Sequence, residues 1–223
     1  MILAAGRGER MLPLTAHTPK PLLPVGGRPL LEHHILNLRA AGFDNLVVNA
    51  AHLAHQIVEF CGDGSRWGIS IKVSVEDQPL ETAGGIVHAL PLLGDRPFAV
   101  INGDIWSDYP LADLAGRLAP AADAHLVLVA NPSHNPAGDF TLRGDHVVQP
   151  CDQTLTFSGL AVYAPGFFAR VGYGKAPLKP LLDRSVEAGR VRGEHYRGSW
   201  VDVGTPQRLQ ALDDDLKTPG KDP

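Results

Sequence analysis

The chain has 223 residues, of which 44% are hydrophobic, and its formal net charge is −4 at pH 7. This length and composition suit one core, so we predict a single domain over residues 1–223, and the weakly acidic balance argues against nucleic acid as a partner. No apolar run approaches the roughly 20 residues of a membrane span and no signal-peptide pattern opens the chain, so we expect a cytoplasmic protein without a membrane partner.

Strand-like and helix-like runs alternate through the first half. Apolar or β-branched runs predict strands at residues 1–5, 46–50, 69–75, 98–102 and 126–130. Amphipathic stretches predict helices at residues 30–41, 52–61 and 82–93. Gly42 would end the first of these helices, and Thr82 would N-cap the third. Such alternation is typical of an α/β fold with a largely parallel sheet.

The second half contains more strand-like pattern. Residues 139–143 and 146–149 flank Gly144-Asp145 and predict a hairpin. Further along we expect a strand at 155–163, a helix at 178–188, a glycine-interrupted strand at 191–203 and a closing helix from Thr205. Pro206 suits the first position of that last helix.

The first apolar run leads into a glycine-rich loop that contains Gly6 and Gly8, followed by Arg10 and by Lys20 between two prolines. Glycines let backbone N–H groups approach an anion, and the two cations add charge, so the loop predicts a nucleoside triphosphate site. The dinucleotide fingerprint fails because Met11 replaces its third glycine, and the P-loop pattern fails because prolines flank Lys20.

Two aspartates follow strand-like runs. Asp104 ends the run that begins at Phe98, and Asp202 lies in the run Trp200-Val-Asp-Val-Gly-Thr. Ligands gather beyond the carboxyl ends of parallel strands, and Mg²⁺ is usually held by one or two carboxylates plus phosphate oxygens. From the residues alone, each aspartate has an ordinary turn or capping role as the alternative.

The opening segment LAAGRGERMLPLTAHTPKPLLPVGGRPLL resembles the signature of the sugar-1-phosphate nucleotidylyltransferases, and NGD and WVDVGT match that family's metal-binding motifs. The resemblance implies a Rossmann-like, GT-A-type α/β fold: a mixed, mostly parallel sheet flanked by helices, with a small β-rich sugar-binding part. The nucleotide would lie in about residues 1–110 and the sugar phosphate in about residues 111–223. Members join a nucleoside triphosphate to a sugar 1-phosphate and release pyrophosphate, with Mg²⁺.

The resemblance also implies roles for individual residues. The nucleotide would contact Gly6, Gly8, Glu9, Arg10, Lys20, Glu76, Gln78, Thr82 and Gly84, with the loop 76–85 around the nucleobase and a small residue that permits close approach. Arg10, Lys20 and Asp104 would be catalytic, and Asp104 and Asp202 would hold the metal. The sugar would contact Asn102, Asn131, Gly138, Asp139, Ser158 and Gly159, although these residue types are also the commonest turn formers.

The chain departs from the family at one position. Many members hold the sugar 1-phosphate with a lysine that precedes an F-x-G strand, whereas this chain has Gln149-Pro-Cys-Asp-Gln153 there. The candidate substitutes are Arg143, Lys175, Lys179 and Arg197, and the sequence does not choose among them.

A narrower resemblance concerns the substrate. The run from Gly193 to Thr205, with PLETAGG and GDGSRWG, is similar to members that use UTP and N-acetylmuramic acid 1-phosphate (MurNAc-1-phosphate) in cell-wall recycling. The lack of a C-terminal extension favours a monomer. The alternatives are a mannose-1-phosphate guanylyltransferase, a glucose-1-phosphate thymidylyltransferase and a non-catalytic nucleotide-sugar sensor. A glycosyltransferase fits less well because Asn102-Gly103-Asp104 lacks the first acid of a D-x-D motif.

Overall fold

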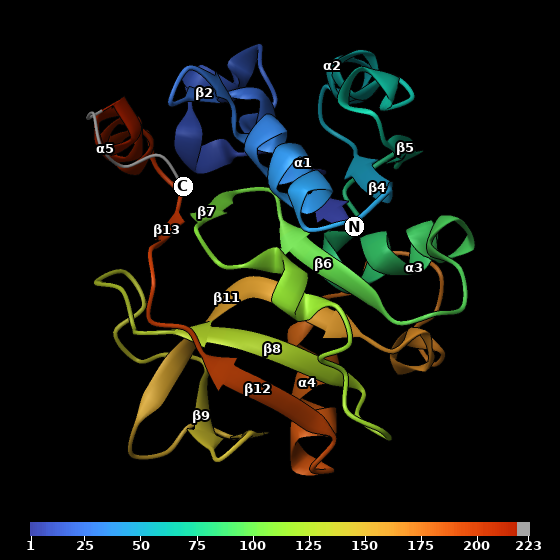
Figure 1. Cartoon of the computed structure of the whole chain (residues 1–223), viewed down its shortest axis with the longest axis vertical. Helices are drawn as coiled ribbons and strands as arrows, with labels where there is room; N and C mark the ends of the chain where they lie inside the picture. The colour runs from blue at the N-terminus through green and yellow to red at the C-terminus, as the bar shows by residue number, and fades with distance from the viewer. Residues whose placement is uncertain (218–223) are drawn as a thin grey trace.

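A computed structural model describes residues 1–217 of the chain (Figure 1). Within these residues nine strands form one sheet in the order β5-β4-β1-β6-β11-β8-β12-β10-β9. They are β1 (Ile2–Leu3), β4 (Asn45–Ala50), β5 (Ser70–Val75), β6 (Phe98–Asn102), β8 (Ala124–Val129), β9 (Phe140–Arg143), β10 (His146–Val148), β11 (Thr154–Tyr163) and β12 (Val191–His195). Two short pairs stand apart, β2 (Pro24–Val25) with β3 (Arg28–Pro29), and β7 (Ile105–Ser107) with β13 (Trp200–Asp202).

The pairing direction changes along the sheet. Strands β5, β4, β1 and β6 run parallel to one another, and β12 is parallel to β8. Strand β11 is antiparallel to both β6 and β8, and β9 and β10 form the expected antiparallel hairpin. The mixed α/β sheet that the resemblance implies is therefore confirmed. The parallel pairing expected from the alternating pattern is continuous in the first half of the chain, whereas the second half contributes mainly antiparallel pairs.

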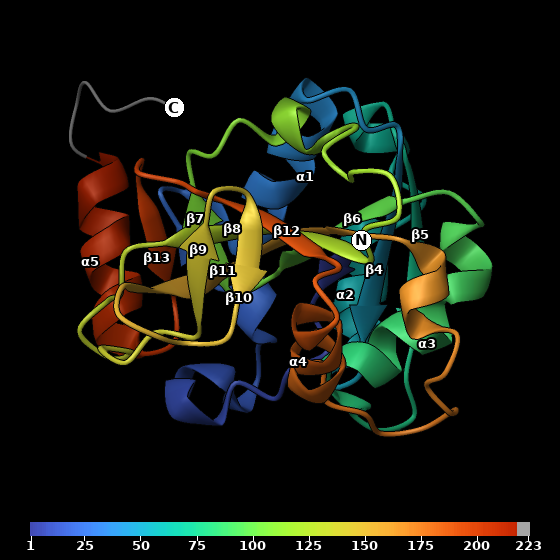
Figure 2. The same cartoon turned by 90° about the horizontal axis from the view of Figure 1, so that it is seen from below.

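Helices cover both faces of the sheet. They are α1 (Leu30–Ala40), α2 (Ala54–Cys61), α3 (Glu81–Leu93), α4 (Lys179–Glu187) and α5 (Pro206–Lys217). Alternate residues of a strand point to opposite faces, so Val48 packs in the core under α1 and α2 while Val47 packs in the core under α3 and α4. Figure 2 shows α1 and α4 on opposite sides of the central strands.

A third, smaller core joins the end of the chain to its beginning. Met11, Trp106, Val203 and Leu209 are buried together in it. Helix α5 lies beside β2 (Figure 1), where the Gly26 N–H donates to the Asp213 carboxylate at 2.8 Å. This packing holds β13 against β7, beyond the carboxyl end of β6.

Two details differ from the sequence prediction. Helix α3 begins at Glu81 and its N-cap is Leu80, with no side-chain capping bond, so Thr82 lies inside the helix instead of capping it. The predicted single strand at 191–203 is two strands in different sheets. The chain turns away from β8 after His195 and passes Gly198, where a Cβ would collide with the Tyr196 side chain.

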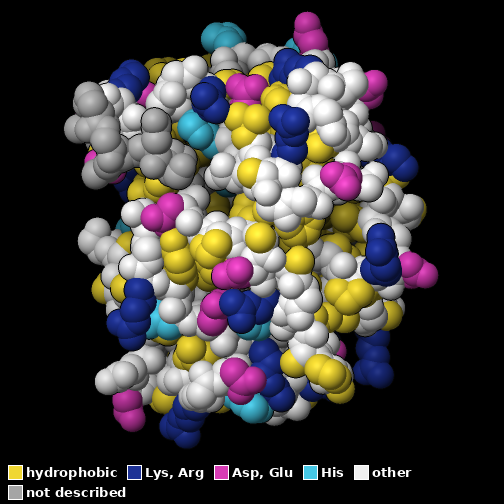
Figure 3. Space-filling model, in the orientation of Figure 1, with side chains coloured by type: hydrophobic (Ala, Val, Ile, Leu, Met, Phe, Trp, Pro, Cys, Tyr) yellow, Lys and Arg dark blue, Asp and Glu magenta, His cyan; other side chains and the backbone are white. Residues whose placement is uncertain are grey.

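The surface agrees with the mixed charge expected from composition. Acidic and basic side chains are interspersed on the face in Figure 3, without a field of one sign. Among the helices of residues 1–217, none has the length and apolarity that a membrane crossing requires.

Candidate active site

A cavity of about 480 Å³ opens beyond the carboxyl ends of the parallel strands. Strand β1 leads into the glycine-rich loop, and the neighbouring β6 ends at Asn102, which pairs with Leu3. Most of the predicted nucleotide contacts line this cavity: Gly6, Gly8, Glu9, Arg10, Lys20, Glu76 and Thr82. The predicted sugar contact Asn102 and the predicted metal ligand Asp104 line it as well. The parallel register thus gathers residues from four separate segments at one edge of the sheet.

The two glycines of the loop have different surroundings. Gly8 has a φ of +65°, and a Cβ there would lie 2.9 Å from the Thr15 side chain, so a larger residue would be both strained and crowded. The Thr15 hydroxyl donates to the Gly8 carbonyl at 2.8 Å and closes the loop on itself. A Cβ at Gly6 would meet no other atom within 4 Å, so the backbone there is open to the cavity.

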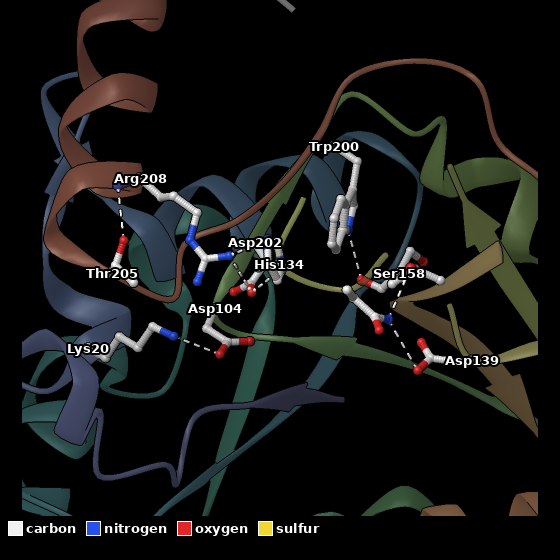
Figure 4. Close-up of polar contacts among 11 residues, drawn as sticks. Lys20, Asp104, His134, Asp139, Ser158, Trp200, Asp202, Thr205 and Arg208 are labelled. Carbon is white, nitrogen blue, oxygen red and sulfur yellow. Dashed lines mark hydrogen bonds and ion pairs between the residues drawn. The ribbon is translucent and has the colours of Figure 1, made fainter. Parts of the chain in front are cut away.

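Lys20 and Asp104 form an ion pair inside the cavity. The Lys20 Nζ lies 2.7 Å from Asp104 Oδ2 (Figure 4). The Lys20 side chain is only 9% exposed, because it rises from a short turn buried between the loop and the sheet, whereas Asp104 is 38% exposed. A buried ammonium beside a more open carboxylate is a suitable place for an incoming phosphate and its metal ion.

Buried polar side chains brace the floor of the cavity. The Asn49 side chain accepts from the Ala4 N–H at 2.8 Å and donates to Glu76 at 2.7 Å. The second Glu76 oxygen accepts from the Leu80 N–H at 2.9 Å. Sequence reasoning missed Asn49, and the signal available was a polar residue inside the apolar run 46–50.

The predicted nucleobase loop divides among three locations. Glu76 and Thr82 line the main cavity, and Gln78 lines an adjoining cavity of about 360 Å³ together with His52. Gly84 is not among the lining residues of either cavity. Its N–H donates to the carbonyl of Ala176 at 3.1 Å, and a Cβ there would lie 2.2 Å from the Gly174 carbonyl oxygen. The close approach that Gly84 permits is therefore to the chain segment 174–176.

Asp202 reaches the cavity region through the small sheet. It pairs in register with Ile105, and the next N–H, that of Val203, donates to the Asp104 carbonyl at 2.8 Å. Its carboxylate lies 3.0 Å from both Arg208 Nη1 and His134 Nε2 (Figure 4). Asp104 directly precedes β7, the strand that pairs with β13, so the two predicted metal ligands lie on adjacent segments, and their binding of a metal stays a prediction.

Arg208 and His134 were not predicted from the sequence. Arg208 Nη1 also lies 2.8 Å from His134 Nδ1, so one guanidinium joins the 131–138 loop to Asp202. The available signal was the position of Arg208 in the first turn of the helix that follows the WVDVGT motif.

The donor set near Asp104 fits a divalent ion that arrives with a nucleotide. Within residues 1–217 no group of three or more His, Cys, Asp and Glu side chains is arranged to hold a metal. Mg²⁺ does not require one, because it is commonly held by one or two carboxylates with phosphate oxygens and waters completing the shell. Asp104 and Asp202 can supply those two carboxylates.

A further cavity of about 450 Å³ lies on the side of Asn102, and we call it the second cavity. It adjoins the first cavity and shares Glu81, Thr82 and Asn102 with it. Asp139 also lines it, and its carboxylate accepts from the Phe157 N–H at 2.8 Å and from Asn135 at 3.3 Å. Gly159 has a φ of +84° and lies so close to Asn102 that a Cβ would be 2.6 Å from its side-chain nitrogen. Gly159 therefore lets Asn102 occupy the junction of the two cavities.

Three other predicted sugar contacts are engaged within the fold. Ser158 is buried, its hydroxyl donates to the Val127 carbonyl at 2.6 Å, and it lies at the β-bulge in β11. The Trp200 indole donates to the Ser158 carbonyl at 2.8 Å and ties β13 to that bulge (Figure 4). Asn131 donates to Thr154, and Gly138 lies against it. These three are not among the lining residues of the two cavities, so their sugar contacts remain predictions.

The comparisons with known proteins agree on one family. A family model described as nucleotidyl transferase matches residues 1–142. An N-acetylmuramate alpha-1-phosphate uridylyltransferase of Neisseria meningitidis serogroup B is 49% identical over 218 residues, 94% of each chain. A protein of the same description from Caulobacter vibrioides is 34% identical, over 96% of this chain and 94% of its own. A putative glucose-1-phosphate thymidylyltransferase structure from Bacillus anthracis superposes with a TM-score of 0.86 at 20% identity, covering 100% of this chain and 96% of that one, which shows the shared fold.

Proposed function

The chain belongs to the nucleotidyl transferase family, and from this premise we propose that it transfers UMP from UTP to MurNAc-1-phosphate, giving UDP-MurNAc and pyrophosphate. The observation that supports this sugar and this base is the 49% identity to the Neisseria uridylyltransferase, because it extends over 94% of both chains. The reaction would belong to peptidoglycan recycling in the cytoplasm.

The proposed chemistry is a direct displacement. A phosphate oxygen of the sugar 1-phosphate bonds to the α-phosphorus of UTP, and the bond from that phosphorus to the bridging oxygen of pyrophosphate breaks. The protein needs no nucleophile of its own, so its contribution is alignment and neutralisation of negative charge. Backbone N–H groups of the loop from Gly6 to Gly8 would hold the triphosphate, and Arg10 would stabilise the departing pyrophosphate.

Lys20 and the metal ion held by the two aspartates would neutralise the remaining negative charge of the phosphates. Asp104 and Asp202 would hold Mg²⁺, which when bound neutralises phosphate oxygens and polarises the α-phosphate. Lys20 would exchange its bond to Asp104 for a bond to a phosphate oxygen as the nucleotide enters. The ion pair seen in the structure thus keeps both groups paired before the nucleotide binds.

A pyrophosphate-release panel tests the proposal. The full-length protein is assayed with each of four nucleoside triphosphates against MurNAc-, GlcNAc-, glucose- and mannose-1-phosphate, with and without Mg²⁺. We expect the highest kcat/KM with UTP and MurNAc-1-phosphate, and activity only with the metal present.

Each other outcome of the panel has a defined meaning. Preference for GTP with mannose-1-phosphate, or for dTTP with glucose-1-phosphate, would refute the substrate assignment within the same family. Nucleotide binding without pyrophosphate release from any pair would support the sensor alternative. Light scattering on the same sample tests the proposed monomer.

A further inference from the structure

The second cavity, defined above by Asn102, Asp139 and their neighbours, is where the sugar of the proposed substrate has room. It meets the first cavity at Asn102, beside Asp104 and the glycine-rich loop. If the phosphates of both substrates lie in the first cavity, the sugar ring extends past Asn102 into the second. This step rests on the proposed function.

The second cavity combines apolar walls with one ammonium group. Its apolar lining comes from Phe140, Phe157, Pro177, Leu178 and Leu182. Among the described residues that line it, Lys179 is the one Lys or Arg. The lining acids already have partners, since Asp139 accepts two hydrogen bonds and Glu81 lies 3.3 Å from Lys175.

The Lys179 ammonium is held at the cavity wall and is still open to a ligand. Its Nζ lies 5.1 Å from the centre of the Phe140 ring and pairs with Asp183 on the same helix. The Lys179 side chain is 54% exposed, so an anion can approach it without unfolding any segment.

The other cations considered from the sequence lie elsewhere. Arg143 is on the β9–β10 hairpin and contacts Cys151, and Lys175 is paired with Glu81. Arg197 belongs to the segment between β12 and β13, outside the lining of the second cavity. Lys179 is therefore the candidate that faces the sugar.

We propose that Lys179 binds the carboxylate of the muramic acid in the second cavity and thereby selects this sugar 1-phosphate over the N-acetylglucosamine analogue. The two sugars differ by a lactyl ether, which adds a carboxylate and a methyl group. In the proposed arrangement Lys20 binds the nucleotide, and the 1-phosphate would meet the metal ion held by Asp104 and Asp202 in the first cavity. The carboxylate is then the anion of the sugar that lacks a partner there. The lactyl methyl group suits the apolar wall beside Lys179.

Steady-state kinetics on the full-length protein test the proposal, with wild-type turnover of UTP and MurNAc-1-phosphate measured first. Lys179→Met keeps the aliphatic stem over Phe140 and removes the charge. We expect its KM for MurNAc-1-phosphate to rise by about tenfold or more, as for loss of a charged hydrogen bond, while the KM for UTP stays unchanged. Lys179→Arg should retain most of the wild-type affinity.

Two further variants separate the lost cation from side effects. Lys217→Met is the matched control, because Lys217 is similarly exposed and pairs with Asp213 four residues away in α5. It should behave as wild type. The double variant Lys179→Met/Asp183→Asn removes both charges, so a KM defect that persists in it belongs to the missing ammonium and not to an uncovered Asp183.

GlcNAc-1-phosphate distinguishes the two anions of the substrate. Assayed as a substrate or a competitive inhibitor, it should bind wild type and Lys179→Met equally. Equal weakening of both sugars would mean that Lys179 meets the shared phosphate, and an unchanged KM for MurNAc-1-phosphate would mean that it meets neither; both results overturn the proposal. Failure of wild type to use MurNAc-1-phosphate would refute the proposed function instead.

Discussion

The Lys20 ammonium lies 2.7 Å from the Asp104 carboxylate, and this ion pair joins the predicted phosphate-binding segment to the predicted metal-binding aspartate. Lys20 lies in the short helical turn that follows the glycine-rich loop, and Asp104 follows the end of β6. The pair compensates a largely buried ammonium, and leaving such a charge unpaired is costly. A phosphate that takes over Lys20 releases Asp104 for a cation, so occupation of the two charges should be coupled.

Asp104→Asn tests that coupling. The amide oxygen can still accept from Lys20 but no longer neutralises its charge, so we expect the protein to fold with a melting temperature lowered by a few degrees. Turnover should fall by about a hundredfold or more, because the amide is a poor ligand for Mg²⁺ and charge neutralisation in the transition state is lost. Pyrophosphate release and thermal unfolding measure the two effects. Asp145→Asn, on the exposed hairpin turn, is the control, and near-normal turnover of Asp104→Asn would exclude a metal role.

Two glycine substitutions separate binding from folding. Gly6→Ala adds a methyl group into open space at the cavity, so its stability should match wild type while its KM for UTP rises. Gly84→Ala places the methyl group against the Gly174 carbonyl and should cost about 1–3 kcal/mol of unfolding free energy. Urea unfolding and UTP kinetics on both variants check the contrast. A stable Gly84→Ala with weakened UTP binding would restore the nucleobase contact first expected of Gly84.

Arg208→Gln should change the metal requirement. The Arg208 guanidinium forms an ion pair with the Asp202 carboxylate at 3.0 Å, so it competes with a divalent ion for that carboxylate. Its removal should lower the Mg²⁺ concentration for half-maximal activity by about two- to fivefold, the range of a partly exposed ion pair. Mg²⁺ titrations of pyrophosphate release measure this, with Arg190→Gln, whose partner is Asp123, as the control. A higher Mg²⁺ requirement would show that Arg208 supports the metal site instead.

His34 should make the fold sensitive to acid. It is buried in α1, and its Nε2 has no hydrogen-bond partner among the described residues. Burial lowers its pKa from 6.5 to about 4, with a further decrease from His33 and an opposing increase from Asp104. Because the unfolded chain binds the proton more tightly, stability should rise with pH between about 4 and 6.5 and fall on acidification, by about 3 kcal/mol in all.

His34→Leu provides the comparison for that pH dependence. Unfolding free energies from urea titrations across the same pH range should show a shallower slope for this variant than for wild type. His55→Leu, at an exposed position of α2, should keep the wild-type slope. Equal slopes for His34→Leu and wild type would assign the acid sensitivity to other groups.

Local sequence was enough for the alternating elements and for the first cavity. Apolar runs and amphipathic stretches predicted most helices and strands to within a few residues, because one buried face imposes its periodicity on the residues that form it. The loop from Gly6 to Arg10 and Asp104 could be placed together because each follows the end of a parallel strand. The phosphate contact of Lys20 was implied by the family resemblance. These features depend on neighbours in the chain.

The rest was decided by contacts between distant segments. Asp202 meets Asp104 only because the chain leaves β12 after His195 and returns to pair with β7, a change of sheet that a continuous strand-like pattern does not reveal. The sequence suggested small size at Gly84 without identifying the segment 174–176 as its neighbour. The sequence left Lys179 as one of four candidate cations, and only the packing of α4 places its ammonium over the Phe140 ring. Local pattern determines which face of an element is buried, but the partner of that face follows from the packing of the whole chain.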